Sequence, residues 1–124
     1  MSTPSPKGAQ DTIDALRDKL RQFADERDWD QFHSPKNLAM ALSVEAAELL
    51  EHFQWLSDAE SAVLAPEKCA KIREELADVL LYLIRLADKL HIDLATAAAD
   101  KLGVNAQKYP VQKARGSNKK YTEF

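Results

Sequence analysis

Apolar residues recur at intervals of three and four along most of this 124-residue chain, and this spacing constrains its fold more than any other feature. Such spacing is typical of amphipathic helices, whose apolar residues line one face. No segment alternates apolar and polar residues convincingly enough to predict a half-buried strand. The sequence therefore predicts an all-α fold with four main helices, at about 11–27, 34–56, 67–90 and 94–108.

Signals at the ends of these helices organise the chain. Ser34, which a proline follows, and Asp93 are of the residue types that cap helix N-termini. The chain is near the commonest length of a single domain. We expect a disordered leader at 1–10, one helical domain at 11–110 and a basic tail at 111–124.

Composition and charge argue against several classes of protein. The net charge of −3 disfavours a nucleic-acid binder, which needs a broad excess of lysine and arginine. The single cysteine has no partner for a disulfide and fits a reducing compartment. The first ten residues lack the apolar core of a signal peptide, and no run approaches the roughly 18 apolar residues of a membrane-spanning helix. We therefore expect a cytoplasmic protein without nucleic-acid or membrane partners.

Acidic residues interrupt the apolar faces of two consecutive helices. In the second predicted helix, Glu45 falls within the apolar stripe and Glu48 lies at its edge, whereas Glu51 points to the opposite side. In the third, Glu75 flanks the main apolar stripe and Asp78 lies one step further round. The residues of that main stripe are Ile72, Leu76, Val79, Leu83, Leu86 and Leu90. An ionised carboxylate on a burying face is costly unless something pairs with it.

The two acid pairs have the spacing of a shared cation site. Because the members of each pair are three positions apart, they lie on adjacent helical turns, and two antiparallel helices could present all four to one point. Carboxylates without cysteine or histidine ligands favour hard cations, first Mg²⁺ and then Mn²⁺ as a substitute. One such pair is common on solvated helix faces and is weak evidence by itself. Two pairs beside apolar stripes favour a metal site.

The segments that carry these acids resemble the E-x-x-E and E-x-x-D motifs of the MazG-like all-α nucleotide pyrophosphohydrolases. Further segments are similar to the dCTP pyrophosphatase branch of that family, so that the resemblance covers about residues 12–124. The segments are SVEAAEL at 43–49 and EELADVL at 74–80 for the acids, and FADERDWDQFH at 23–33, FQW at 53–55, Lys101, Asn105, KYP at 108–110 and KKYTE at 119–123 for the branch.

The resemblance implies hydrolysis of a deoxynucleoside triphosphate, most simply dCTP or a modified dCTP, to the monophosphate and pyrophosphate. Glu45, Glu48, Glu75 and Asp78 would then bind Mg²⁺, and either Glu45 or Glu48 would act as the general base. Hydrolysis of dUTP or of a broad range of nucleotides is the near alternative. The alternative from another class is a non-catalytic helical binding module whose acids hold a structural cation.

The resemblance also implies a base pocket, in which Trp29 and Trp55 would stack on the base. Stacking tolerates any base, so cytosine selection needs hydrogen bonds, for which backbone groups and the loop that ends at His33 are the candidates. Tyr82 lies one turn after Asp78 and would pack against the sugar. Without the resemblance, the tryptophans would be interpreted as core or interface anchors, and Tyr82 equally as a core residue.

Basic and amide side chains near the C-terminus are the candidates for binding the triphosphate. Lys101, Asn105 and Lys108 share one face of the last predicted helix, although a solvated helix end would have the same composition. Arg115 belongs to the basic tail, which would either close over phosphates or stay disordered.

Apolar residues outside the main stripes predict an assembly of several copies. Met40 and Val44 lie off the stripe of the second helix, and Leu81 and Ile84 lie off that of the third. Helices that are apolar on more than one side need more than one partner. We therefore expect a four-helix bundle completed by homo-oligomerisation. The resemblance implies a dimer, commonly paired into a tetramer, with each active site bordered by a neighbouring subunit.

Overall fold

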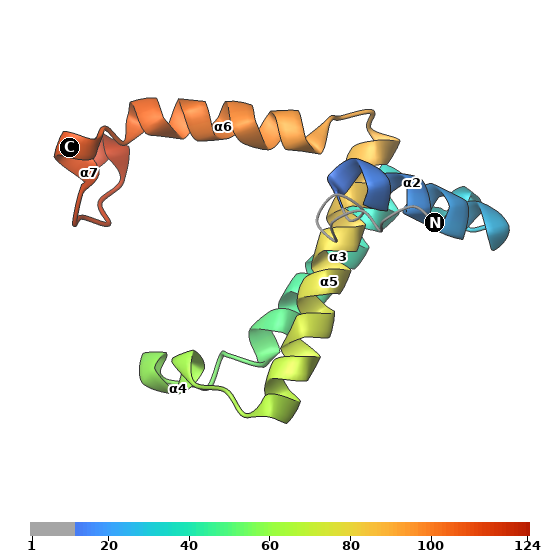
Figure 1. Cartoon of the computed structure of the whole chain (residues 1–124), viewed down its shortest axis with the longest axis horizontal. Helices are drawn as coiled ribbons and strands as arrows, with labels where there is room; N and C mark the ends of the chain where they lie inside the picture. Colours follow the sequence, from blue (N-terminus) through green and yellow to red (C-terminus); the bar gives the residue numbers. More distant parts are fainter. Residues whose placement is uncertain (1–11) are drawn as a thin grey trace, which may run out of the picture. The chain divides into compact units, whose positions relative to one another are not determined.

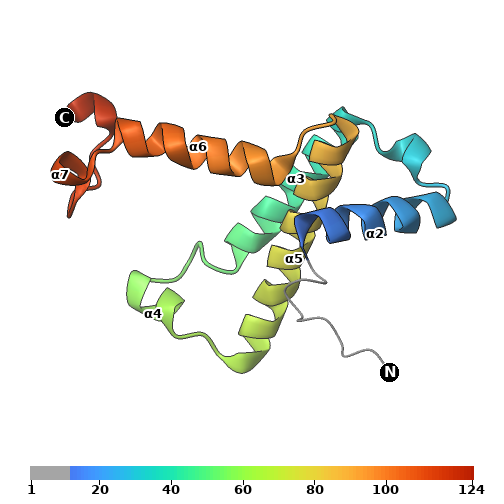
Figure 2. The ribbon, with the colours of Figure 1, turned by 45° about the horizontal axis from the view of Figure 1, so that its top comes forward.

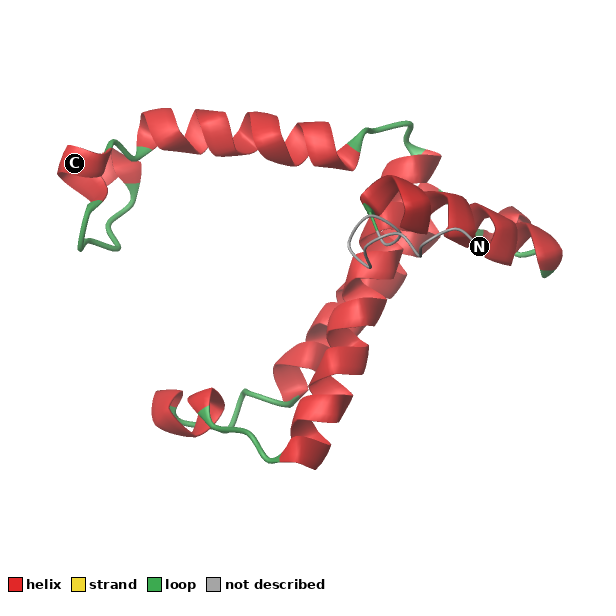
Figure 3. Ribbon diagram, in the orientation of Figure 1, coloured by secondary structure: helices red, strands yellow, loops and turns green. Residues whose placement is uncertain are grey.

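The structure is a computed structural model that describes residues 12–124. Four long helices account for most of it: α2 (Ile13–Glu26), α3 (Pro35–Glu51), α5 (Pro66–Lys89) and α6 (Leu94–Lys108) (Figure 1). The shorter elements are η1 (Asp30–Phe32), α4 (Asp58–Ala62), α7 (Val111–Ala114) and η2 (Tyr121–Glu123). Residues 12–124 contain no strand, so the predicted all-α fold is confirmed (Figure 3). The leader predicted at 1–10 lies outside the described residues.

Side-chain caps begin most of the helices. The Ser34 side chain accepts a hydrogen bond from the backbone N–H of Asn37, and the Asp93 side chain accepts one from Thr96, as the sequence predicted. Thr12 caps α2 in the same way, and Ser57 forms a reciprocal capping box with Glu60 at the start of α4. Each cap satisfies an N–H group that has no partner within its helix.

The chain divides after Ile92 into two compact units. In the first unit, α3 packs along α5 and α2 packs against α5, as Figures 1 and 2 show. Arg21 of α2 joins this packing, because its guanidinium donates to both carboxylate oxygens of Asp88 on α5. The second unit holds α6 and the C-terminal segment. No helix between residues 12 and 124 is long and apolar enough to cross a membrane.

Helix α3 ends at Glu51, earlier than the predicted end at position 55 or 56. His52 and Phe53 donate backbone hydrogen bonds three residues back, to Leu49 and Leu50, as in a tightening turn. The cap residue Ser57 of α4 follows directly. Because the helical spacing of apolar residues continues through this turn, periodicity alone predicted too late an end for the helix.

The face of α5 that the chain buries differs from the predicted main stripe. Ile72 is buried, but Leu76 and Leu83 of that stripe are exposed. Ile84, which the sequence placed off the stripe, is 1% exposed, and Arg85 beside it is 5% exposed. Because α5 is apolar on more than one side, its sequence does not tell which side its own chain covers.

The C-terminal tail of the second unit contains defined elements. Helix α7 and η2 lie within it, and the ring of Tyr109 makes edge contacts with Tyr121 at 5.9 Å and Phe124 at 5.8 Å between centroids. The Lys108 ammonium lies 4.9 Å from the centre of the Tyr121 ring. These contacts hold the end of the chain against the end of α6.

Candidate active site

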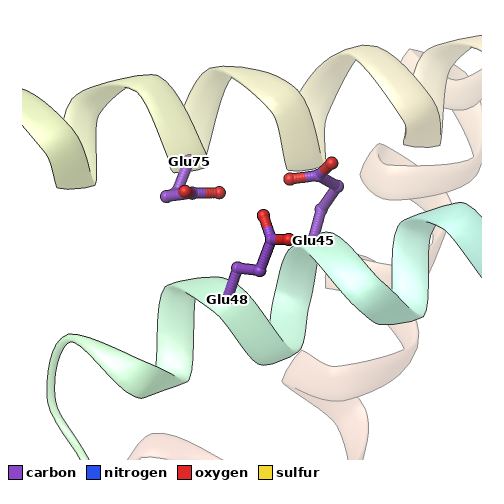
Figure 4. Close-up of side chains that lie close together, drawn as sticks. All are labelled: Glu45, Glu48 and Glu75. Carbon is purple, nitrogen blue, oxygen red and sulfur yellow. The ribbon is translucent and has the colours of Figure 1, made fainter.

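Three carboxylates face one another between α3 and α5. Glu45 and Glu48 extend from α3 and Glu75 extends from α5 into the space between the helices (Figure 4). One oxygen of each lies within 4.8 Å of the others. The spacing of three on α3 places its two acids on adjacent turns, and the packing of α3 along α5 brings Glu75 opposite them. We call these residues the carboxylate cluster.

The carboxylate cluster holds negative charge that the described protein does not neutralise. Burial raises the pKa of Glu45 to about 7, and the neighbouring charges of Glu48 and Asp78 add to this rise. The Oε2 atoms of Glu45 and Glu75 are buried, and within residues 12–124 neither has a hydrogen-bond partner. Buried oxygens without donors are rare in proteins and indicate a missing partner.

A hard divalent cation fits this donor set. The cluster offers only carboxylate oxygens, which are the preferred ligands of such cations. A cation would supply both the positive charge that the clustered acids lack and a partner for the two buried oxygens. Glu51, on the other side of α3, is exposed, as the sequence predicted.

An aromatic cavity of about 240 Å³ lies in the same unit. Trp29, His33 and Tyr82, three of the predicted base- and sugar-binding residues, line it. The backbone N–H of Trp29 donates to Ala24 at the end of α2, and the Trp29 ring meets the Phe23 ring edge-on at 5.7 Å. The other residues that line the cavity are Leu20, Phe23, Ala24, Leu38, Asp78, Leu81 and Arg85.

Asp78 connects the aromatic cavity with the carboxylate cluster. It lines the cavity together with Tyr82, which is one turn later on α5, and its charge also raises the pKa of Glu45. On α3, the other helix of the pair, Leu38 lines the same cavity. Glu45 lies two turns further along the same face of α3. The carboxylate cluster and the cavity are therefore neighbours along the same two helices.

Trp55 does not line this cavity in the single chain, and its predicted place in the base pocket stays a prediction. It lies in the turn after α3 and is 87% exposed. Leu38, which does line the cavity, is near the opposite end of α3, about 20 Å from the last turn at 1.5 Å per residue. Such exposure also excludes a core role for Trp55 within its own chain.

The predicted phosphate-binding residues belong to the second unit. Lys101, Asn105 and Lys108 are spaced four and three residues apart on α6, and so share one face of that helix. Asn105 and Lys108 are half-buried, while Lys101 is exposed, as is Arg115 after α7. Their binding to phosphates stays a prediction.

Arg85, a buried charge at the wall of the cavity, was not predicted as a site residue from the sequence. Its Nε–H donates to Nδ1 of His33 at 3.1 Å, and its Nη2 donates to Asp30 at 2.7 Å. Lys89 also donates to Asp30, at 2.7 Å. Burial lowers the pKa of His33, and the positive charge of Arg85 lowers it further. The signal in the sequence was an arginine within an otherwise apolar stretch of the third predicted helix, one turn after Tyr82.

Several known proteins resemble this chain in sequence and in fold. The model of the MazG-like family matches residues 40–124. Rat dCTP pyrophosphatase 1 is 49% identical over 115 residues, and human dCTP pyrophosphatase 1 is 44% identical over 115 residues. Each alignment covers 91% of this chain and 68% of the relative. The crystal structure of a pyrophosphatase from Archaeoglobus fulgidus superposes with a TM-score of 0.75 at 39% identity, covering 89% of this chain and 98% of that one.

Proposed function

The chain belongs to the MazG-like family, and we propose that it hydrolyses dCTP, or dCTP with a modified cytosine, to the monophosphate and pyrophosphate. The observation that carries this proposal is the position of Asp78, which belongs to the wall of an aromatic cavity and acts electrostatically on the carboxylate cluster. A nucleotide has the matching pair of features, a flat base and a charged triphosphate. The relatives named dCTP pyrophosphatase 1 support cytosine as the base.

Glu45, Glu48, Glu75 and Asp78 would hold the cation, which we propose to be Mg²⁺, with Mn²⁺ as a substitute. When bound, it supplies the positive charge that neutralises the triphosphate and orients the attacking water. The Oε2 atoms of Glu45 and Glu75, which have no hydrogen-bond partner within residues 12–124, support these residues as ligands.

Side chains of the protein transfer the proton and bind the base, the sugar and the phosphates. The carboxylate of Glu45 or Glu48 accepts a proton from the attacking water. Trp29 stacks on the base, which contributes about 1–3 kcal/mol, and Tyr82 packs against the sugar. Lys101, Asn105, Lys108 and Arg115 bind phosphate oxygens by charge and hydrogen bonding.

We further propose that the protein acts as a homodimer, paired into a tetramer in the cytoplasm. Large apolar side chains are exposed on both packed helices of the single chain, and a second copy would cover them. They include Met40, Val44 and Leu50 of α3, and Leu76, Leu80 and Leu83 of α5. Trp55, exposed after α3, would then border the site of a neighbouring subunit.

The test is a panel of nucleotides. The purified protein is incubated with Mg²⁺ and each deoxynucleoside triphosphate, and the products are separated by chromatography. We expect dCMP and pyrophosphate to form fastest. If dUTP is converted faster, or many nucleotides are converted equally, the substrate is dUTP or a broad range of nucleotides and not dCTP. If no nucleotide is hydrolysed, the result would favour the alternative of a non-catalytic helical binding module.

A further inference from the structure

Arg85 is the most deeply buried charged residue among those that the structure describes, and it lies outside the carboxylate cluster. Each of its three nitrogens contacts a side chain. Nε donates to His33, Nη2 donates to Asp30, and Nη1 lies 3.4 Å from Asp88. A buried charge with this many partners holds those partners in place as much as they hold it. Of the three, only His33 faces the aromatic cavity beside Trp29.

The contact between Arg85 and His33 determines which imidazole nitrogen carries the proton. A guanidinium does not lose its protons in proteins, so its Nε can only donate. Nδ1 of His33 must therefore be the acceptor and carry no hydrogen. In the neutral ring the single N–H is then on Nε2. The lowered pKa of His33 is consistent with a neutral ring.

The Nε2–H group is left available to a ligand. Within residues 12–124, no hydrogen bond to Nε2 is formed, while the imidazole lines the cavity at 6.4 Å from the Trp29 ring centre. A pyrimidine that stacks on Trp29 carries its hydrogen-bonding groups at its edge. Cytosine has two acceptors there, the O2 carbonyl and the N3 ring nitrogen, and both need a donor from the protein.

We propose that Arg85 is a positioning residue that holds His33 as the neutral Nε2–H tautomer, so that His33 donates a hydrogen bond to O2 or N3 of the base. This inference rests on the proposed function for the identity of the ligand, whereas the tautomer itself follows from the contacts of the protein alone. On the far side of the guanidinium, Asp30 accepts the hydrogen bond from Arg85 Nη2, and Lys89 donates separately to the same carboxylate.

The tautomer is tested by ¹⁵N NMR of the histidine rings in the full chain with Mg²⁺ at about pH 8, where a neutral ring is expected. The His33 signals are assigned by their loss in H33A. We expect Nε2 protonated and Nδ1 unprotonated in the wild type. R85K keeps the positive charge but loses Nε, and we expect it to populate both tautomers. K89M removes the other contact to Asp30 and keeps the Arg85–His33 bond, so it is the matched control and should match the wild type.

Steady-state kinetics with dCTP test the consequence. R85K should raise KM by roughly two- to tenfold, the range for one neutral hydrogen bond, with kcat changed less than twofold. K89M should leave both constants unchanged, and R85K should have no further effect on KM in the H33A background. A protonated Nδ1 in the wild type overturns the proposal. A folded R85K with an unchanged KM would also overturn it. So would an R85K substitution that raises KM by the same factor in the H33A background as in the wild type. Absence of any turnover by the wild type would instead refute the proposed function, and the NMR spectra would still decide the tautomer.

Discussion

Replacing Glu45 with glutamine is expected to stabilise the protein when no divalent cation is present. Glu45 lies among other acids, with one buried oxygen that lacks a donor within residues 12–124. Its ionisation is therefore disfavoured in the folded chain but not in the unfolded chain. Glutamine has nearly the same shape, removes one negative charge and supplies an N–H donor to the neighbouring carboxylates. An acid that a cation site needs thus destabilises the metal-free fold.

The size of the effect follows from the pKa of Glu45, which rises from 4.5 to about 7. At about 1.4 kcal/mol per pKa unit, the upper limit is about 3.4 kcal/mol. Water reaches part of the Glu45 side chain and screens its charge, so we expect roughly 1–2 kcal/mol. For a domain of this size, that corresponds to a rise in Tm of roughly 4–8 °C.

The effect of E45Q depends on pH in a defined direction. Between about 4.5 and about 7 the folded wild type retains a proton on Glu45 that the unfolded chain has lost. The free energy of unfolding therefore falls as the pH rises through this interval and is level above it. E45Q lacks this proton, so its advantage over the wild type should be full at pH 8 and small at pH 5.

Thermal unfolding in EDTA, followed by circular dichroism at both pH values, measures this difference. E51Q is the control, because Glu51 is an exposed acid on the other side of α3 and its replacement should change Tm little. Adding Mg²⁺ should stabilise the wild type more than E45Q. A metal-free E45Q with the Tm of the wild type at pH 8, or one stabilised no more than E51Q, would refute the account of a repulsive cluster.

Four further predictions follow from the same structure. The Mg²⁺ affinity of the wild type should rise from pH 6 to pH 8 with release of protons, because the cation competes with the proton on Glu45; calorimetry in buffers of different ionisation enthalpy would show this, and a constant affinity would contradict it. E48Q should lower kcat by at least about 100-fold with an unchanged helical spectrum, and retained activity would remove Glu48 from the site. W29A should raise KM for dCTP roughly tenfold or more, and an unchanged KM would exclude stacking on Trp29. D88N should lower the free energy of unfolding at pH 7 by about 1–3 kcal/mol. Because hydrogen bonds with Arg21 lower the pKa of Asp88 from its ordinary value of about 3.8, this loss should begin to shrink below that pH and vanish only below the lowered pKa of the folded state; urea unfolding that shows the same loss at pH 3 as at pH 7 would contradict this.

The helices could be predicted from the sequence because local rules determine them. The caps Ser34 and Asp93 and the apolar spacing place the starts of α3 and α6 where the structure has them. The end of α3 depends on a turn whose residues keep the helical apolar spacing, so no local signal marks it. Which face of α5 is buried depends on how α2 and α3 pack on it, and this is a property of the tertiary structure.

The acids of the candidate site were predictable because they break a local pattern. Glu45 and Glu75 lie on or beside apolar stripes, and they are the residues whose buried oxygens lack partners within the described chain. Arg85 breaks the apolar pattern of α5 in the same way, but its role depends on His33 and Asp30, which are more than fifty positions away in sequence. Contacts over such a separation cannot be derived from periodicity.

The central claim is that the cavity binds the base of a cytosine nucleotide while the adjoining carboxylate cluster supports hydrolysis between its α- and β-phosphates. The most direct measurement is ³¹P NMR of dCTP incubated with the full chain and Mg²⁺. We predict that signals of dCMP and pyrophosphate replace the three triphosphate signals, and that the triphosphate signals stay unchanged with E48Q. Formation of dCDP and orthophosphate, or an unchanged spectrum with the wild type, would contradict it.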